Sequence, residues 1–244
     1  MTQARDFRDL LKRERMVVAP GAYDCITAKL IEQAGFSAVY MTGAGTAATL
    51  GYPDFGLVTM SEMVANAGRI AAAVERPVIA DADTGYSNEL NVFRTVREFE
   101  HSGVAGIHIE DQEFPKKCGH LEGKRVIPRE DHIAKIRAGA AARRDQDFMI
   151  IARTDSRAVA GFDEAIARAN AALAAGADMA FVEAPQTQDE VAAVPRLVKG
   201  PCLLNVVWGG KTPDLDLREA EAMGYKLAIV PGLLIRRPGT IASL

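Results

Sequence analysis

The sequence has few cysteine, histidine and tryptophan residues. Its 244 residues include 3 cysteines, 4 histidines and 1 tryptophan. No two cysteines have the C-x-x-C spacing of a structural zinc site or a redox motif, which argues against both classes of site. We interpret the cysteines as free thiols. Cys25 and Cys202 have apolar neighbours in the sequence, so we expect both to be small buried residues.

Charge and hydropathy argue against two kinds of partner. The formal net charge is −3 and the basic residues are dispersed, so no basic field is available for nucleic acid. No apolar stretch reaches the roughly 18–20 residues of a membrane span. Residues 1–16, "MTQARDFRDLLKRERM", alternate in charge and lack the apolar core of a secretory signal. We therefore expect a cytoplasmic protein without a nucleic-acid or membrane partner.

Short apolar runs recur along the chain and indicate a parallel sheet. They are "MVVAPGA" (16–22), "AVYMTG" (38–43), "PVIADAD" (77–83), "GIHIED" (106–111), "MIIARTD" (149–155), "MAFVEA" (179–184), "CLLNVV" (202–207) and "KLAIVPG" (226–232). Alanine-rich segments with helical spacing, such as 88–103 and 162–178, separate them. Near-continuous apolar strands are typical of parallel sheets covered by helices. The pattern predicts one (β/α)₈ barrel domain over residues 1–244. A doubly wound open sheet is the alternative, but no GxGxxG opens the first helix.

Polar residues follow the apolar runs at their carboxyl ends, which form the catalytic face of such a barrel. They are Thr42, Asp81, Asp83, His108, Glu110, Asp111, Arg153, Asp155, Glu183 and Asn205. Because side chains alternate along a strand, Asp81 and Asp83 are expected to project to one side. Converging carboxylates repel one another unless a cation lies among them, and oxygen ligands favour Mg²⁺ or Mn²⁺ over zinc.

Each of these residues also has a structural interpretation. Asp111 or Asp155 alone could be a helix cap, and His108 could be a core histidine. Arg153, at an inward strand end, needs an anion, and we favour a substrate carboxylate over an internal ion pair. His101 and His132 fall on predicted helices, where we expect them on the surface.

The stretch "FPKKCGH" (114–120) places a thiol between lysines and a histidine. Such neighbours lower the pKa of a thiol, so that it can exchange a proton near neutral pH. A buried inert cysteine is the alternative, and the charged surroundings disfavour it.

Eight motifs together resemble the isocitrate lyase / phosphoenolpyruvate mutase superfamily over nearly the whole chain. They are "GAYD", "GYPDFG", "DADTGY", "HIEDQ", "KKCGH", "ARTD", "VEAP" and "GGKTP". "KKCGH" resembles the signature of the carbon–carbon lyase branch. The resemblance implies Mg²⁺-dependent (or Mn²⁺-dependent) cleavage of a 2-hydroxy dicarboxylate, of the methylisocitrate or dimethylmalate type, to an α-keto acid and a second carboxylic acid.

The resemblance also assigns roles to residues. It implies that Asp81 and Asp83 hold the metal, with Glu110 acting through water. The substrate-binding residues it implies are Tyr40, Thr42, Gly43, Asp54, His108, Arg153, Glu183, Asn205 and Arg236. A mobile lid is implied at about residues 112–126, with catalytic residues Lys116, Lys117, Cys118 and His120. Cys118 would protonate the carbanion that leaves on cleavage.

Two departures from the superfamily pattern keep other functions open. Trp208 stands in "NVVWGG" where the lyases usually have a glutamate, so we expect it to disfavour a third substrate carboxylate. The last helix is expected to be short, and an oligomer (a dimer or tetramer) that exchanges this helix would be affected. An oxaloacetate decarboxylase, or another 2-oxo acid enzyme, and a catalytically degenerate dicarboxylate-binding barrel are therefore the alternatives.

Overall fold

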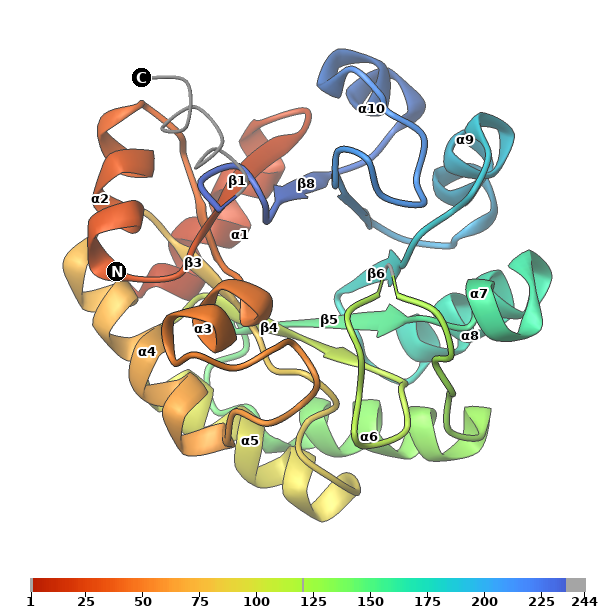
Figure 1. Cartoon of the computed structure of the whole chain (residues 1–244), viewed down its shortest axis with the longest axis horizontal. Coiled ribbons are helices and arrows are strands. Elements are labelled where there is room, and N and C mark those ends of the chain that lie inside the picture. Colours follow the sequence, from red (N-terminus) through yellow and green to blue (C-terminus); the bar gives the residue numbers. More distant parts are fainter. Residues whose placement is uncertain (1, 120, 236–244) are drawn as a thin grey trace.

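The computed structural model describes residues 2–119 and 121–235. Within these residues eight parallel strands form one closed barrel in sequence order, and β8 pairs with β1 (Figure 1). The strands are β1 Val17–Ala22, β2 Val39–Met41, β3 Val78–Asp81, β4 Gly106–Glu110, β5 Met149–Thr154, β6 Met179–Val182, β7 Cys202–Asn205 and β8 Leu227–Val230. The predicted (β/α)₈ fold is confirmed. Most strands end one or two residues before the apolar run does.

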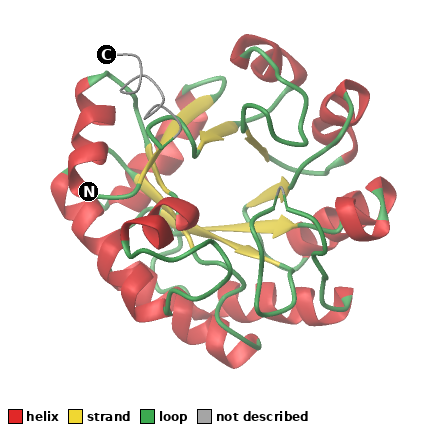
Figure 2. Ribbon diagram, in the orientation of Figure 1, coloured by secondary structure: helices red, strands yellow, loops and turns green. Residues whose placement is uncertain are grey.

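Helices surround the barrel (Figure 2). They are α1 Gln3–Arg13, α2 Cys25–Gln33, α3 Gly43–Thr49, α4 Met60–Ala73, α5 Glu89–His101, α6 Arg129–Ala142, α7 Arg157–Ala160, α8 Phe162–Ala174, α9 Gln188–Leu197 and α10 Leu217–Met223. The predicted helices at 88–103 and 162–178 correspond to α5 and α8. In α5 the buried residues Val92, Val96 and Phe99 recur at helical spacing, and the Asn88 side chain caps the first turn.

The amino-terminal end of the barrel is filled by apolar side chains. Helix α1 packs there, and its buried residues Phe7 and Leu10 belong to one apolar cluster with Val17, Met149 and Leu227 at the starts of their strands. The backbone N–H of Val78 at the start of β3 also donates to the α1 side chain of Gln3. Helix α1 therefore closes one end of the barrel, and the opposite end holds the polar side chains.

Three predictions about single residues have different outcomes. Cys202 is buried, and burial raises its pKa to about 12, as expected for an inert core thiol. Cys25 is only half-buried, with Sγ 3.4 Å from the carbonyl of Arg69, so its predicted burial is wrong in part. His101 is exposed as predicted.

The surface position predicted for His132 is wrong, because its side chain is fully buried. The sequence predicts that His132 lies on a helix, at its surface. However, α6 turns the face that carries His132, Lys135, Ile136 and Gly139 inward. Among the described residues, no helix has the length and apolar character needed to cross a membrane.

Candidate active site

The end of β2 forms one wall of the barrel mouth. The hydroxyl of Tyr40 lies 2.9 Å from His108 Nε2 and 3.3 Å from Asp81 Oδ2. The backbone N–H of Gly43, at the start of α3, donates to the same Asp81 oxygen over 3.2 Å. A Cβ atom at residue 43 would lie 2.5 Å from that oxygen, so only glycine permits this approach. Thr42 caps α3 with its hydroxyl.

His108 is buried beneath this wall. Its ring stacks on Tyr40, with centroids 5.7 Å apart, and meets the edge of Phe181 at 5.6 Å. Burial lowers the pKa of His108 to about 4, so the imidazole is neutral near pH 7. His108 therefore acts here as a hydrogen-bond partner of Tyr40 and not as a positive charge.

Asp81 and Asp83 lie close together, although not by strand alternation. Strand β3 ends at Asp81, and Asp83 lies beyond it with φ +47°, a left-handed conformation that is uncommon for residues other than glycine. The N–H of Asp83 donates to Asp81 Oδ1 over 2.9 Å. The expectation that both residues share a strand face is thus wrong, but both carboxylates are buried in the same region. Backbone strain of this kind recurs at functional sites.

The carboxylates at this end outnumber the cations, which fits a divalent metal ion. Burial, together with the charge of Asp81, raises the pKa of Asp83 to about 6, despite the ammonium of Lys116 at 2.6 Å. Burial also raises the pKa of Glu110 well above its usual value, and Glu110 Oε1 has no hydrogen-bond partner among the described residues. Mg²⁺ prefers oxygen ligands, and carboxylate oxygens whose negative charge nearby cations do not fully balance are suited to bind it. No three His, Cys, Asp or Glu side chains of residues 2–119 and 121–235 converge closely enough to bind an ion together, so water would complete its shell.

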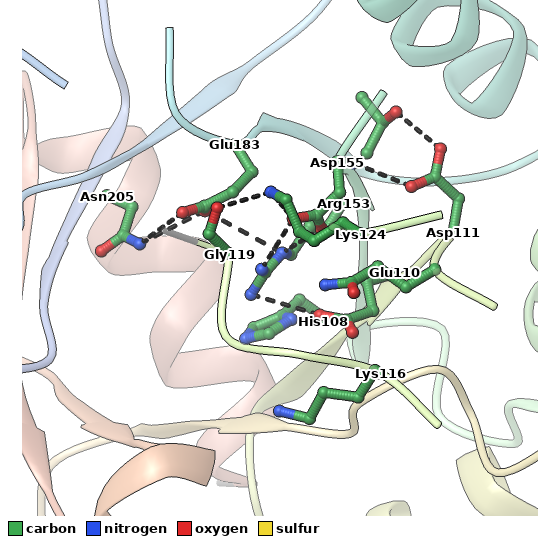
Figure 3. A network of polar contacts seen from close by, with 12 residues as sticks. His108, Glu110, Asp111, Lys116, Gly119, Lys124, Arg153, Asp155, Glu183 and Asn205 are labelled. Carbon is green, nitrogen blue, oxygen red and sulfur yellow. Dashed lines mark hydrogen bonds and ion pairs between the residues drawn. The ribbon is translucent and has the colours of Figure 1, made fainter. Parts of the chain in front are cut away.

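Arg153 projects from β5 into a ring of carboxylates (Figure 3). Its Nε lies 2.9 Å from Asp155 Oδ2 and 3.9 Å from Glu183 Oε2, and its Nη1 lies 3.3 Å from Glu110 Oε2. The guanidinium also lies over the Phe181 ring at 5.2 Å. The internal ion pairs that we had disfavoured are therefore present. A substrate carboxylate would have to share Arg153 with them.

The loop between β4 and α6 rises over the ends of β5 and β6 (Figure 1). Gln112 stabilises the first part of this loop. Its Nε2 donates to the Lys117 carbonyl at 2.8 Å, and its Oε1 accepts from the Lys117 N–H at 3.0 Å. The ammonium of Lys116 is buried between Asp54 and Asp83. The Nζ of Lys117 instead donates to the Gly123 carbonyl at the surface, away from the barrel mouth.

A cavity of about 180 Å³ lies between this loop and the barrel mouth. The loop contributes Lys116, Cys118 and Gly119 to its lining. The polar barrel residues that line it are Tyr40, Thr42, Asp54, Asp81, Arg153, Glu183 and Asn205. The remaining wall is formed by Ala44, Val207, Pro231, Gly232 and Ile235. Most of the predicted site residues thus surround one small space.

Other predicted residues do not line the cavity. His108, Asp83 and Glu110 lie behind its wall, and Lys117 points away. Trp208 is 45 % exposed and is not part of the lining, whereas its neighbour Val207 is. His120 and Arg236 lie outside the described residues.

Lys124 is a buried residue that the sequence did not indicate. Its Nζ lies 2.7 Å from Asp155 Oδ1, and it also donates to the carbonyl of Gly119 (Figure 3). Asp111 accepts from Thr154 Oγ1 and the N–H of Asp155, and it pairs with Arg168, so it links β5 to α8 and does not serve only as a helix cap. A lysine in an irregular loop belongs to no periodic pattern, so no signal in the sequence identifies it.

A family model and individual known sequences both match this chain over nearly its whole length. The family model described as phosphoenolpyruvate phosphomutase matches residues 7–240. The chain is 51 % identical over 232 residues to the 2,3-dimethylmalate lyase of Eubacterium barkeri. The aligned region covers 95 % of this chain and 80 % of that lyase. It is 46 % identical over 224 residues to the 2-methylisocitrate lyase of Aeropyrum pernix, covering 92 % of this chain and 72 % of the other.

Solved structures share the whole fold. An oxaloacetate acetylhydrolase in complex with the inhibitor 3,3-difluorooxalacetate superposes with a TM-score of 0.94 at 39 % identity, covering 99 % of this chain and 84 % of the other. A phosphonopyruvate hydrolase in complex with oxalate and Mg²⁺ superposes with a TM-score of 0.89 at 32 % identity, covering 100 % and 85 %.

Proposed function

The chain belongs to the phosphoenolpyruvate phosphomutase family, within the isocitrate lyase superfamily, and from this membership we propose the reaction that it catalyses. It cleaves the carbon–carbon bond of a 2-hydroxy dicarboxylate of the dimethylmalate type, giving an α-keto acid and a second carboxylic acid. The relatives named above as lyases support this reaction class.

The observation that carries the proposal is the placement of Cys118 on one side of a small cavity whose other side carries Asp81, Arg153 and Tyr40. A thiol on this side faces groups that can bind a carboxylate and a hydroxyl. The arrangement therefore suits a reaction in which one half of a diacid is held while the other half receives a proton.

The chemistry follows from these positions. For 2,3-dimethylmalate, the 2-hydroxyl gives its proton to solvent as the C2–C3 bond breaks, and C2 becomes the carbonyl carbon of pyruvate. The electron pair of the broken bond passes to C3, which leaves as the enolate of propionate. Cys118 donates a proton to C3. Arg153 pairs with a carboxylate of the substrate, while Tyr40, Thr42 and the backbone at Gly43 orient the keto-acid half.

Asp81 and Asp83 would hold Mg²⁺ or Mn²⁺, with Glu110 contributing through water. The uncompensated carboxylate charge and the unpartnered Glu110 oxygen support this assignment. When bound, the ion would stabilise negative charge on the oxygens of the keto-acid half. A related hydrolase has been solved with oxalate and Mg²⁺.

Residues 112–126 act in this proposal as a lid on a single barrel domain. The lid lets substrate enter and then holds Lys116 and Cys118 over it. We also propose that the protein is a cytoplasmic homo-oligomer, a dimer or tetramer. Apolar side chains exposed near the barrel mouth, including Leu57 at 55 % and Phe114 at 64 %, support association between copies.

A cysteine substitution tests the proposal. Cys118→Ser should lose most cleavage of 2,3-dimethylmalate, because a serine hydroxyl is too weak an acid to protonate C3 near pH 7. Pyruvate release in the presence of Mg²⁺ is the measurement. Cys25→Ser, on α2, is the matched control and should keep full activity. Iodoacetamide should inactivate the unsubstituted protein through Cys118.

Two results would overturn the proposal. If no 2-hydroxy diacid yields a keto acid with Mg²⁺ or Mn²⁺, the chain is a dicarboxylate-binding barrel without lyase activity. If Cys118→Ser keeps every activity, then Cys118 is not the proton donor.

Oxaloacetate is the second candidate substrate. The fold shared with an oxaloacetate acetylhydrolase bound to a difluorinated oxaloacetate favours it, as does the small cavity. Hydrolysis would release oxalate and acetate, whereas decarboxylation would release pyruvate and CO₂. Mass spectrometry of the products separates both from diacid cleavage. Decarboxylation should depend little on Cys118, since solvent can protonate the resulting enolate.

A further inference from the structure

Lys124 belongs to the loop above the cavity, yet its side chain is only 1 % exposed. Its Nζ lies 2.7 Å from Asp155 Oδ1 and donates a hydrogen bond to the Gly119 carbonyl (Figure 3). A buried ammonium needs such partners, because its desolvation is otherwise costly. Lys124 therefore joins the loop to the barrel through a contact that solvent does not screen.

Gly119 is a point of close contact between the loop and the barrel. A Cβ atom at this residue would lie 2.5 Å from Arg153 Nη2 and 2.6 Å from Glu183 Oε1. The backbone at Gly119 thus rests directly on these two side chains. Cys118 precedes it and lines the cavity. The position of the Cys118 side chain consequently depends on how firmly the next residue is held.

Asp155 links this contact to the cavity wall. Its carboxylate accepts from Arg153 Nε at 2.9 Å and Nη2 at 3.2 Å, and its backbone N–H donates to Asp111 Oδ1 at 2.8 Å. A single buried carboxylate is shared by Lys124 of the loop and Arg153 of the wall. When Lys124 engages Asp155, it neutralises part of the charge that Arg153 would otherwise balance. Arg153 is then better able to accept a substrate carboxylate.

We propose that Lys124 is a positioning residue, which fixes Cys118 over the cavity because its ammonium binds the Gly119 carbonyl of the loop and the Asp155 carboxylate of the barrel together. Lys124 does not line the cavity and so does not touch the reacting atoms. Its contribution to catalysis rests on the proposed lyase function, whereas its hold on the loop does not. Removing the ammonium leaves the Gly119 carbonyl without this donor and shifts the loop toward open conformations.

Lys124→Met keeps the apolar stem of the side chain and removes the ammonium. Arg125→Met is the matched control, since Arg125 is the next cation of the loop and pairs with Glu113 at the surface. The first readout is the rate at which iodoacetamide alkylates Cys118 in the ligand-free protein, followed by peptide mass spectrometry. A lost charge-assisted hydrogen bond should raise this rate about tenfold in Lys124→Met. Arg125→Met should leave it unchanged.

The second readout is kinetic. Misplacement of Cys118 should lower kcat for diacid cleavage by about 10²-fold. The affinity for Mg²⁺ should stay near that of the unsubstituted protein, because Lys124 contacts neither Asp81 nor Asp83. Gly119→Ala provides a second variant that keeps Lys124. Its methyl group would collide with Arg153 and Glu183, so it should raise the alkylation rate in the same way.

Equal alkylation rates in Lys124→Met and the unsubstituted protein would overturn the proposal. So would a loss of Mg²⁺ affinity and thermal stability that matches the loss of kcat, because that pattern indicates general damage to the barrel. If the unsubstituted protein cleaves no diacid, the proposed function fails, and the alkylation rates alone decide the role of Lys124.

Discussion

The two ends of the barrel interior are filled by opposite kinds of side chain, although both are buried. At the amino-terminal end, Phe7 of α1 belongs to one apolar cluster with Met149 and Leu227. At the carboxyl end the same strands carry Asp81, Glu110 and Arg153, which are also buried. Burial stabilises the first group by about 1.5–3 kcal/mol for each large side chain, whereas buried carboxylates are costly unless a cation compensates them. The difference indicates that one end supplies stability and the other supplies the site.

The largest effect is expected from Phe7→Ala at the apolar end. Loss of the fully buried ring should lower the free energy of unfolding by about 3–5 kcal/mol, measured by urea denaturation. The activity of each folded molecule should not change. Leu30→Ala, on the exposed face of α2, is the control and should change stability little. A large fall in kcat of folded Phe7→Ala would break the comparison between the two ends.

Asp83→Ala, at the polar end, should give the reverse result, with a loss of activity and little change in stability. Turnover should fall by more than about 10²-fold, because Asp83 would hold the metal ion that stabilises negative charge developing on the substrate oxygens. The free energy of unfolding at pH 7 should change little, since loss of a carboxylate that burial and Asp81 disfavour offsets loss of the Lys116 ion pair. Strong destabilisation with retained activity in this variant would contradict the assignment.

Mg²⁺ should stabilise the protein only through the carboxyl end of the barrel, where Asp81 and Asp83 lie. Binding to the folded state at a concentration of 100 times Kd would raise the free energy of unfolding by about 2.7 kcal/mol. Thermal denaturation with and without EDTA measures this effect. Phe7→Ala should retain the increase, and Asp83→Ala should lose it. Equal stabilisation of all three proteins would place the ion elsewhere.

The smallest effect is expected from His132→Leu, on α6 outside the barrel, and it concerns how the free energy of unfolding depends on pH. Burial lowers the pKa of His132, so the folded state resists protonation. Stability is complete above the unfolded pKa near 6.5 and declines as the pH falls, because the unfolded chain takes up the proton first. His132→Leu should lose less stability between pH 7.5 and pH 5.5 than the unsubstituted protein, in urea denaturation at each pH. His101→Leu, at an exposed position, is the matched control for the loss of an imidazole.

The barrel and much of its mouth could be predicted because both depend on periodic features. Apolar runs identify strands, and the polar residues that end them meet at one face, as Asp81, His108 and Arg153 do. The positions of Asp83 and Lys124 do not follow from periodicity. Asp83 is oriented by a left-handed backbone conformation, and Lys124 lies in an irregular loop. The burial of His132 depends on which face of α6 packs inward, and a helix position in the sequence does not identify that face. The ion pairs of Arg153 depend on distances between strands, which no sequence pattern encodes.

The pairing of β8 with β1 also has a consequence for the order in which the chain folds. Val17 of β1 lies beside Leu227 of β8, nearly the full length of the chain away. Such a contact must overcome a large loop-closure entropy and raises the contact order, which slows folding. During synthesis, β1 lacks this neighbour until the last strand has left the ribosome. The early strands must therefore persist as an incomplete sheet with an open edge, which makes this step the one most exposed to aggregation.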